Sequence, residues 1–240
     1  MKTILSLALL FATVLSAHAQ KEGPIIITRL AGNFYIYTTH RDLGGHPFPS
    51  NSLYVVTDSG VVMIDTPWNP EQTGPLLDSI RARHHMNVVI CISTHHHEDR
   101  TAGLDVLKER GIPTYSTEQT LELCREKSER QAAHAFARDT TFSVGGLHFQ
   151  TFYPGQGHSS DNIVVWFPKE KVLYGGCFIK STEAIDLGNL ADANISAWPA
   201  SIKKMMRKFP NPAFIIPGHQ GWKNIKSPQH TLDLLRKAKK

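Results

Sequence analysis

The chain has 240 residues with a formal net charge of +5, and 41% of its residues are hydrophobic and 20% charged. These values are ordinary for a soluble globular protein, and the length allows one or two domains with a sizeable core. The basic residues are spread along the chain and form no basic stripe interleaved with aromatic residues, so we expect no nucleic acid partner.

Residues 1–19 have the pattern of a cleaved signal peptide. Lys2 supplies a positive start, residues 4–15 form an apolar core too short to span a bilayer, and Ala17-His18-Ala19 matches a small-x-small cleavage site. A structured N-terminal helix is the alternative interpretation. We expect a mature domain over residues 20–240 that is exported, periplasmic where the host has an outer membrane, and without a membrane anchor.

Strand-like runs open the mature chain. The second and third runs are separated by a Gly- and Pro-rich segment, residues 42–51, whose one large apolar residue is Phe48. This composition predicts a mobile hairpin tip or flap. The predicted strands are 25–30, 34–38, 52–57 and 61–64, and the predicted helix is 71–83.

The sequence HHHEDR at residues 95–100 follows a strand predicted over 87–94. Because side chains alternate between faces near the end of a strand, we expect His95, His97 and Asp99 to point to one side. His96, Glu98 and Arg100 would then point to the other side. Two imidazoles and a carboxylate suit a divalent ion such as Zn²⁺. A helical arrangement, with His95 one turn from Asp99, and a solvated His-rich loop are the alternatives.

The remaining chain alternates helices and strands. We expect a layered single domain of the α/β or α+β class, because mixed strands and helices continue without a linker or a repeat. The predicted helices are 104–110, 118–127, 196–208 and 230–239, and the predicted strands are 114–116, 141–144, 147–153, 162–167, 172–175 and 213–216.

Three further candidate ligands each lie just beyond a predicted strand. His158 lies in a glycine-rich turn, His219 in a Pro-Gly turn, and Cys177 directly after two glycines. A single loop histidine is more often structural, but strand-end loops are where layered α/β folds place their chemistry. Cys91 and Cys124 fit buried, small hydrophobic positions. A free Cys177 in an exported protein is most easily explained if a metal holds it as a thiolate.

Six candidate ligands are too many for one tetrahedral zinc ion and suit two. Each ion then keeps an open position for water, which is typical of a catalytic site. Two ions about 3.5–4 Å apart can stabilise charge at both the attacking and the leaving atom. One ion would be held by His95, His97 and His158, and the other by Asp99, Cys177 and His219.

The combined motifs resemble those of class B metallo-β-lactamases of the first, broad-spectrum subclass, over essentially the whole mature chain. They are H-x-H-x-D at 95–99, G-x-G-H-S-x-D-N at 155–162, G-G-C-x-x-K-S at 175–181 and P-G-H at 217–219. The resemblance implies a four-layer αββα sandwich with two Zn²⁺ ions per chain at the sheet edges. It also implies a small-molecule β-lactam as substrate, and we expect a monomer.

The resemblance also implies roles for residues that are not informative alone. It makes Lys180 the group that binds the substrate carboxylate, and places Asn189 near the lactam carbonyl. Phe48 would close over the apolar part of the substrate. Asp65 would be a buried acid that supports the metal ligands from beneath.

The implied reaction is hydrolysis of the β-lactam amide bond of penicillins, cephalosporins and carbapenems, which confers antibiotic resistance. A metal-bound hydroxide would attack the lactam carbonyl, and Asn189 would help to stabilise the oxyanion. The second zinc would stabilise the leaving nitrogen until a proton arrives from water or by way of Asp99.

Three alternatives stay open: a metallo-hydrolase for another ester or amide, a zinc-binding protein without catalysis, and a nucleic-acid-processing enzyme. Other hydrolases of the same superfamily usually carry a histidine directly after the metal-binding Asp, and an Asp as the late ligand. Here these positions are Arg100 and Cys177. This pair favours the β-lactamase interpretation.

Overall fold

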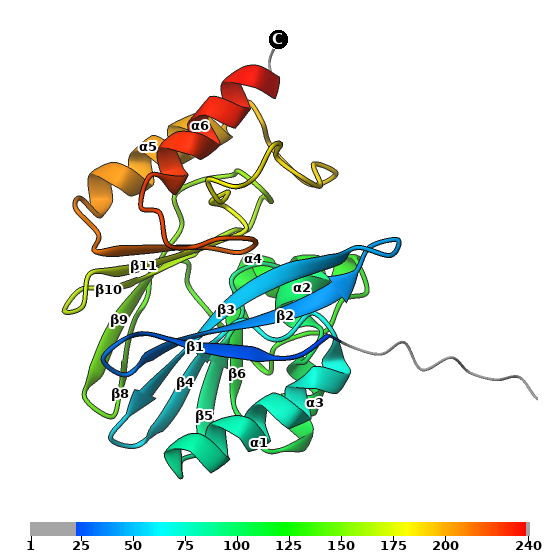
Figure 1. Ribbon diagram of the computed structural model, residues 1–240, viewed down its shortest axis with the longest axis vertical. Coiled ribbons are helices and arrows are strands. Elements are labelled where there is room, and N and C mark those ends of the chain that lie inside the picture. The colour runs from blue at the N-terminus through cyan, green and yellow to red at the C-terminus, as the bar shows by residue number, and fades with distance from the viewer. Residues whose placement is uncertain (1–22, 239–240) are drawn as a thin grey trace, which may run out of the picture.

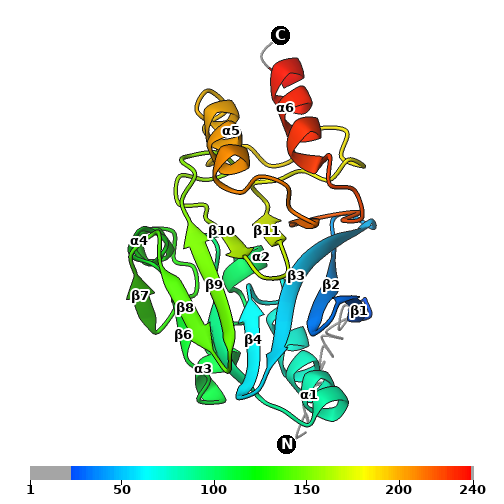
Figure 2. The same ribbon diagram turned by 90° about the vertical axis from the view of Figure 1, so that its left-hand side faces the viewer.

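The computed structural model describes residues 23–238, so the expected signal peptide lies outside the described residues. Two β-sheets pack face to face, and helices cover the outer face of each sheet (Figure 1). Figure 2 shows α5 and α6 at one end of the molecule and α1 and α3 at the other, with the sheets between them.

The first sheet has seven strands in the order of the chain. The strands from β1 to β4 pair as antiparallel neighbours, and those from β4 to β7 pair as parallel neighbours. Its strands are β1 (Ile26–Ala31), β2 (Phe34–Asp42), β3 (Pro47–Thr57), β4 (Gly60–Ile64), β5 (Val88–Ile92), β6 (Thr114–Thr117) and β7 (His134–Phe136).

The second sheet has the strand order β12-β11-β10-β9-β8. Only the β11–β12 pair is parallel within it. Its strands are β8 (Thr141–Val144), β9 (Leu147–Phe152), β10 (Val164–Phe167), β11 (Val172–Gly176) and β12 (Phe214–Pro217).

Three apolar clusters account for the layers. One, which includes Ile64, Phe149 and Tyr174, fills the space between the sheets. A second packs α1 and α3 on the first sheet, and a third packs α5 and α6 on the second. The predicted four-layer αββα sandwich is therefore confirmed. The helices are η1 (Pro70–Gln72), α1 (Thr73–His84), α2 (Glu98–Thr101), α3 (Leu104–Glu109), α4 (Glu118–Glu126), α5 (Trp198–Lys208) and α6 (Ser227–Ala238).

The structure differs from the sequence-based expectation at several element ends. The segment 42–51 was predicted as a hairpin tip or flap, and it does contain a hairpin turn, but the strands reach further into it than predicted: β2 continues to Asp42 and β3 begins at Pro47. β7 was not predicted, since its three residues pair only with the edge of β6. Over residues 23–238, no helix combines the length and the apolar character needed to span a membrane.

Candidate metal centre

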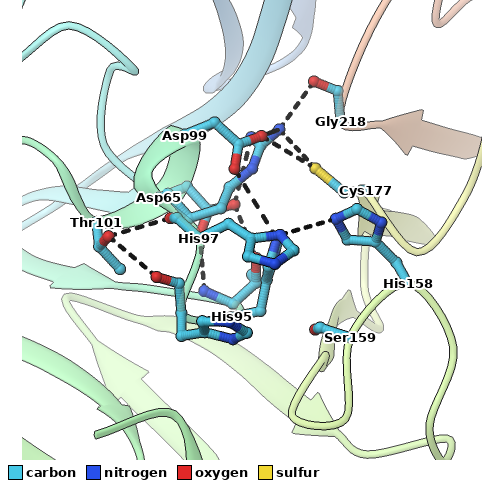
Figure 3. Close-up of polar contacts among 12 residues, drawn as sticks. Asp65, His95, His97, Asp99, Thr101, His158, Ser159, Cys177 and Gly218 are labelled. Carbon is cyan, nitrogen blue, oxygen red and sulfur yellow. Dashed lines mark hydrogen bonds and ion pairs between the residues drawn. The ribbon is translucent and has the colours of Figure 1, made fainter. Parts of the chain in front are cut away.

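The six candidate ligands come from four chain segments that meet at one edge of the sandwich. His95 and His97 follow β5, Cys177 follows β11, and His219 follows β12. Because β11 and β12 are parallel, their ends lie at the same edge. His158 reaches this edge from the loop between β9 and β10. Figure 3 shows His97 facing His158, with Cys177 and Asp99 beside them.

The predicted alternation of side chains over residues 95–100 is wrong, because α2 begins directly after His97. Arg100 does not point away from the site: its Nη2 atom lies 2.9 Å from Cys177 Sγ. His95 Nε2 lies 3.9 Å from Asp99 Oδ1, close to the one-turn spacing of the helical alternative. The structure nevertheless brings His95, His97 and Asp99 together, with their ligand atoms within 4.8 Å of one another.

Three histidines form a compact group. The ring centroids of His95, His97 and His158 are 4.8–5.0 Å apart, and His97 Nδ1 lies 3.0 Å from His158 Nε2. Burial lowers the pKa of His95 and of His158 well below the usual value. Their rings are therefore neutral and carry a lone pair that can bind a metal. His95 Nε2 and His158 Nδ1 are buried without a hydrogen-bond partner.

A second group contains Asp99, Cys177 and His219. Cys177 Sγ lies 3.2 Å from Asp99 Oδ2 and 3.2 Å from His219 Nε2, and His219 Nε2 lies 3.1 Å from the same carboxylate oxygen. Burial raises the pKa of the Cys177 thiol, although Arg100 opposes this effect. A thiolate at this position therefore requires a further cation, which a zinc ion would provide.

The ligand atoms form overlapping groups and not two separate triplets. The group Asp99, Cys177 and His219 coincides with one predicted set. The three histidines of the other predicted set are neighbours, but the compact groups combine His95 with His97 and Asp99, or with His158 and Cys177. Nitrogen, sulfur and carboxylate donors in this number fit zinc. The assignment of individual ligands to two ions stays a prediction.

Arg100 is a central residue of the site that the sequence analysis placed on the wrong side. It is fully buried. Its Nη2 lies 2.9 Å from Asp99 Oδ2 and donates to the Gly218 carbonyl at 3.0 Å. Gly218 allows this approach, because a Cβ atom there would lie 2.8 Å from both Arg100 Nη2 and Cys177 Sγ. Burial would raise the pKa of Asp99, but Arg100 and His219 hold it well below its usual range.

Asp65 supports the histidine segment from beneath, as the resemblance implied. It is fully buried at the end of β4 and adopts a positive φ of 63°. Its carboxylate accepts hydrogen bonds from Thr94 N at 2.7 Å, Thr94 Oγ1 at 2.9 Å and Tyr174 Oη at 2.7 Å. These bonds fix the backbone directly before His95.

Asp192 is a functional candidate that the sequence analysis missed. Its Oδ2 lies 3.0 Å from His97 Nε2, and its Oδ1 accepts from Lys127 Nζ at 2.9 Å. It fixes the orientation of His97, so that Nδ1 faces the other ligands. Nothing in its sequence neighbourhood marks it, because its partners are 65 and 95 residues away.

A cavity of about 700 Å³ opens above the ligands. Its lining includes His97, Asp99, His158 and His219. The three predicted substrate-contacting residues, Phe48, Lys180 and Asn189, line the same cavity. The structure therefore brings every predicted site residue to one place: His95 and Cys177 lie buried beneath the cavity, and the others line it.

Comparisons with known proteins agree with this architecture. The family model described as "Metallo-beta-lactamase superfamily" matches residues 45–219. The chain is 42% identical to "Metallo-beta-lactamase type 2" of Elizabethkingia meningoseptica over 98% of this chain and 94% of that protein. It is 39% identical to "Metallo-beta-lactamase IND-1" of Chryseobacterium indologenes over 92% of each chain.

Solved structures show the same relationship. The metallo-beta-lactamase from Pontibacter korlensis superposes with a TM-score of 0.86 at 36% identity, covering 89% of this chain and 99% of that one. The structure of metallo-beta-lactamase IND-7 superposes with a TM-score of 0.85 at 40% identity, covering 88% and 98%. This chain belongs to the class B metallo-β-lactamases of the metallo-β-lactamase superfamily.

Proposed function

We propose that this chain hydrolyses the amide bond of penicillins, cephalosporins and carbapenems with two bound zinc ions, and thereby confers resistance to them. One observation carries this proposal: the zinc-type ligands and Lys180 line or underlie a single cavity. Metal ions held by these ligands would activate water for the attack, and a cation beside them recognises an anionic substrate.

His95, His97 and His158 would hold one zinc ion, and Asp99, Cys177 and His219 the other. The bound ions would supply Lewis acidity, which would activate water and stabilise developing negative charge. Arg100 and Asp192 keep Asp99, Cys177 and His97 in position through the contacts described above.

Lys180 orients the substrate. Its Nζ lies 5.5 Å from the centre of the Trp198 ring, which fixes the half-buried side chain at the wall of the cavity. A β-lactam carries a carboxylate next to the lactam nitrogen, and the Lys180 ammonium pairs with it. This pairing places the lactam carbonyl over the metal ligands.

Asn189 donates a hydrogen bond to the lactam carbonyl. Its Oδ1 accepts from Ala191 N at 3.0 Å, which turns the amide and leaves Nδ2 as the donor available to the substrate. As the carbonyl oxygen gains negative charge, this donor stabilises it. The departing nitrogen takes its proton from water, directly or by way of the Asp99 carboxylate.

Phe48 covers the apolar part of the substrate. Its ring packs against the ring of His219 with centroids 5.1 Å apart, and it lines the cavity on the side of the β2–β3 hairpin. It therefore helps to exclude water from the reacting group.

Export to the periplasm and a monomeric state belong to the same proposal. The signal pattern of residues 1–19 supports export. N-terminal sequencing of the protein from a periplasmic fraction should give a chain that starts at Gln20, and retention of residues 1–19 would reject the cleavage. Gel filtration with light scattering should give the mass of one chain.

The function is tested by measuring zinc content and hydrolysis on the same preparation of residues 20–240. We expect two zinc ions per chain and turnover of a penicillin. If the protein binds two zinc ions but hydrolyses no β-lactam, the proposed substrate class is wrong and the proposed metal centre is supported. Failure to bind zinc would reject both.

A further inference from the structure

The β2–β3 hairpin extends beyond its sheet as a two-stranded ribbon. β1 pairs with β2 only as far as Thr38, whereas β2 and β3 stay paired as far as Asp42 and Pro47. Figure 1 shows the tip projecting from the layers. Such a ribbon is marginally stable alone, and Pro47 and Pro49 have no N–H to donate to the ladder. Contacts with the body of the protein must therefore hold it in place.

Two contacts fix the base of the ribbon through its backbone. His219 Nδ1 lies 2.8 Å from the carbonyl oxygen of Pro49, and Asn69 Nδ2 donates to the carbonyl of His40 at 3.2 Å. Both contacts place the strands. The His219 ring also packs against the Phe48 ring, with centroids 5.1 Å apart, but among the described residues no contact of His219 reaches the β2 side of the ribbon opposite Phe48.

On the β2 strand of the ribbon, Arg41 supplies a side-chain contact with the body of the protein near the tip. Its guanidinium forms an ion pair with the Glu98 carboxylate and lies over Trp68, with Cζ 5.2 Å from the ring centroid. Arg41 is directly opposite Phe48 in the ladder, so the two side chains project from the same face of the ribbon. A contact that fixes Arg41 therefore also fixes the direction of Phe48.

The partners of Arg41 belong to the wall of the cavity. Glu98, Trp68 and Phe48 all line it. The Trp68 ring also packs against His219, with centroids 5.9 Å apart. In addition, the ion pair neutralises a carboxylate that would otherwise repel an anionic substrate.

We propose that Arg41 is a positioning residue that holds Phe48 over the cavity. It does so by pairing with Glu98 and stacking on Trp68, contacts that we call the ribbon latch. The latch sets the affinity for substrates with a large apolar substituent, an inference that rests on the proposed β-lactam hydrolysis. It contributes to substrate binding and leaves the chemical step unchanged.

The first arm of the test does not depend on activity. Arg41→Ala should raise the hydrogen-exchange rates of the ribbon amides, residues 39–42 and 48, by about three- to tenfold, as expected for losing a half-exposed ion pair and a cation–π contact. Arg41→Lys keeps the charge without the planar fork and should restore part of the protection. Arg29→Ala, which removes an arginine of β1 outside the ribbon, is the matched control. It should leave the hydrogen-exchange rates of the ribbon amides unchanged.

The second arm is kinetic. In Arg41→Ala, KM for a penicillin with a large apolar side chain should rise by about three- to tenfold, with kcat nearly unchanged. KM for a β-lactam without that side chain should rise less. Glu98→Gln should have a similar effect alone and add little in the Arg41→Ala background, because both changes remove the same contact.

If the hydrogen-exchange rates of the ribbon amides are unchanged in Arg41→Ala, the proposal of a ribbon latch is wrong. Faster exchange with an equal rise of KM for both substrates would show that Arg41 has only a structural role, and would also overturn the proposal. If the wild-type chain hydrolyses no β-lactam, the proposed function fails. The exchange arm then still decides whether Arg41 holds the ribbon.

Discussion

The guanidinium of Arg100 lies against the thiol of Cys177, with Nη2 2.9 Å from Sγ. The same arginine donates to the Asn51 carbonyl at 2.8 Å and to Tyr174 Oη at 3.1 Å. One buried cation therefore joins the first sheet, the second sheet and the candidate metal centre. Its removal should affect both the stability of the fold and the affinity for metal.

Replacing Arg100 by Met should destabilise the protein by about 3–5 kcal/mol, because Asp99 and Asp65 would be left buried without their cation. Urea unfolding measures this loss of free energy. Arg100→Lys retains the charge but not the fork and should lose less. A loss below about 1 kcal/mol in Arg100→Met would show that water replaces the guanidinium at no great cost.

Cys177→Ser should weaken zinc binding in the proposed second site by at least about tenfold and reduce turnover in parallel. The hydroxyl is a harder and less readily ionised ligand than the thiol. Titration with zinc against a competing chelator measures the affinity. Cys124→Ala, another buried free cysteine that belongs to no candidate ligand group, is the control. Equal zinc affinity and turnover in Cys177→Ser and wild type would remove Cys177 from the ligand set.

Lys180→Ala should raise KM for carboxylated β-lactams by about tenfold or more, with a smaller effect on kcat. The loss corresponds to a charge-assisted hydrogen bond of about 1.5–3 kcal/mol. Steady-state kinetics against an uncharged lactam, together with Lys169→Ala in the exposed β10–β11 turn, provide the comparison. The pairing would be refuted by an equal rise of KM for the uncharged lactam.

Asp65 should make the stability of the zinc-free protein depend on pH. Burial raises its pKa to about 6, whereas an exposed Asp titrates at about 4. Between these values the folded chain holds a proton that the unfolded chain has lost. Its contribution to stability therefore falls as pH rises through this window and levels off above about pH 6, a change of about 2–3 kcal/mol.

Asp65→Asn should abolish that part of the pH dependence. Urea unfolding of chelator-treated wild type and variant, at about pH 4 and about pH 7, gives the difference directly. If both proteins lose the same stability between these two pH values, Asp65 does not carry the raised pKa.

The layered fold could be predicted from the sequence, because buried strands and amphipathic helices have recognisable periodicity. The bounds of β4, β8 and α3 agree with the predicted segments to within one residue. Residues 42–51 were predicted as a hairpin tip or flap, but the length of the paired strands was underestimated, because the Gly and Pro residues oppose strand formation. The structure shows pairing as far as Asp42 and Pro47, helped by contacts that are distant in sequence.

The candidate ligands could likewise be found from motifs. The residues that position those ligands could not. Arg100 was misplaced because the start of α2 replaced the two-residue period of the strand with a helical turn. Asp192 was missed because its partners, His97 and Lys127, come from other parts of the chain. Such contacts depend on the packing of distant segments, and no local pattern reports them.

The most direct test is hydrolysis of a penicillin, a cephalosporin and a carbapenem by purified residues 20–240, before and after removal of zinc with a chelator. We predict turnover of all three substrates, its loss with the chelator, and its recovery when two zinc ions per chain are restored. Turnover that survives complete removal of zinc, or its absence in protein carrying two zinc ions, would contradict the proposal that this metal centre hydrolyses β-lactams.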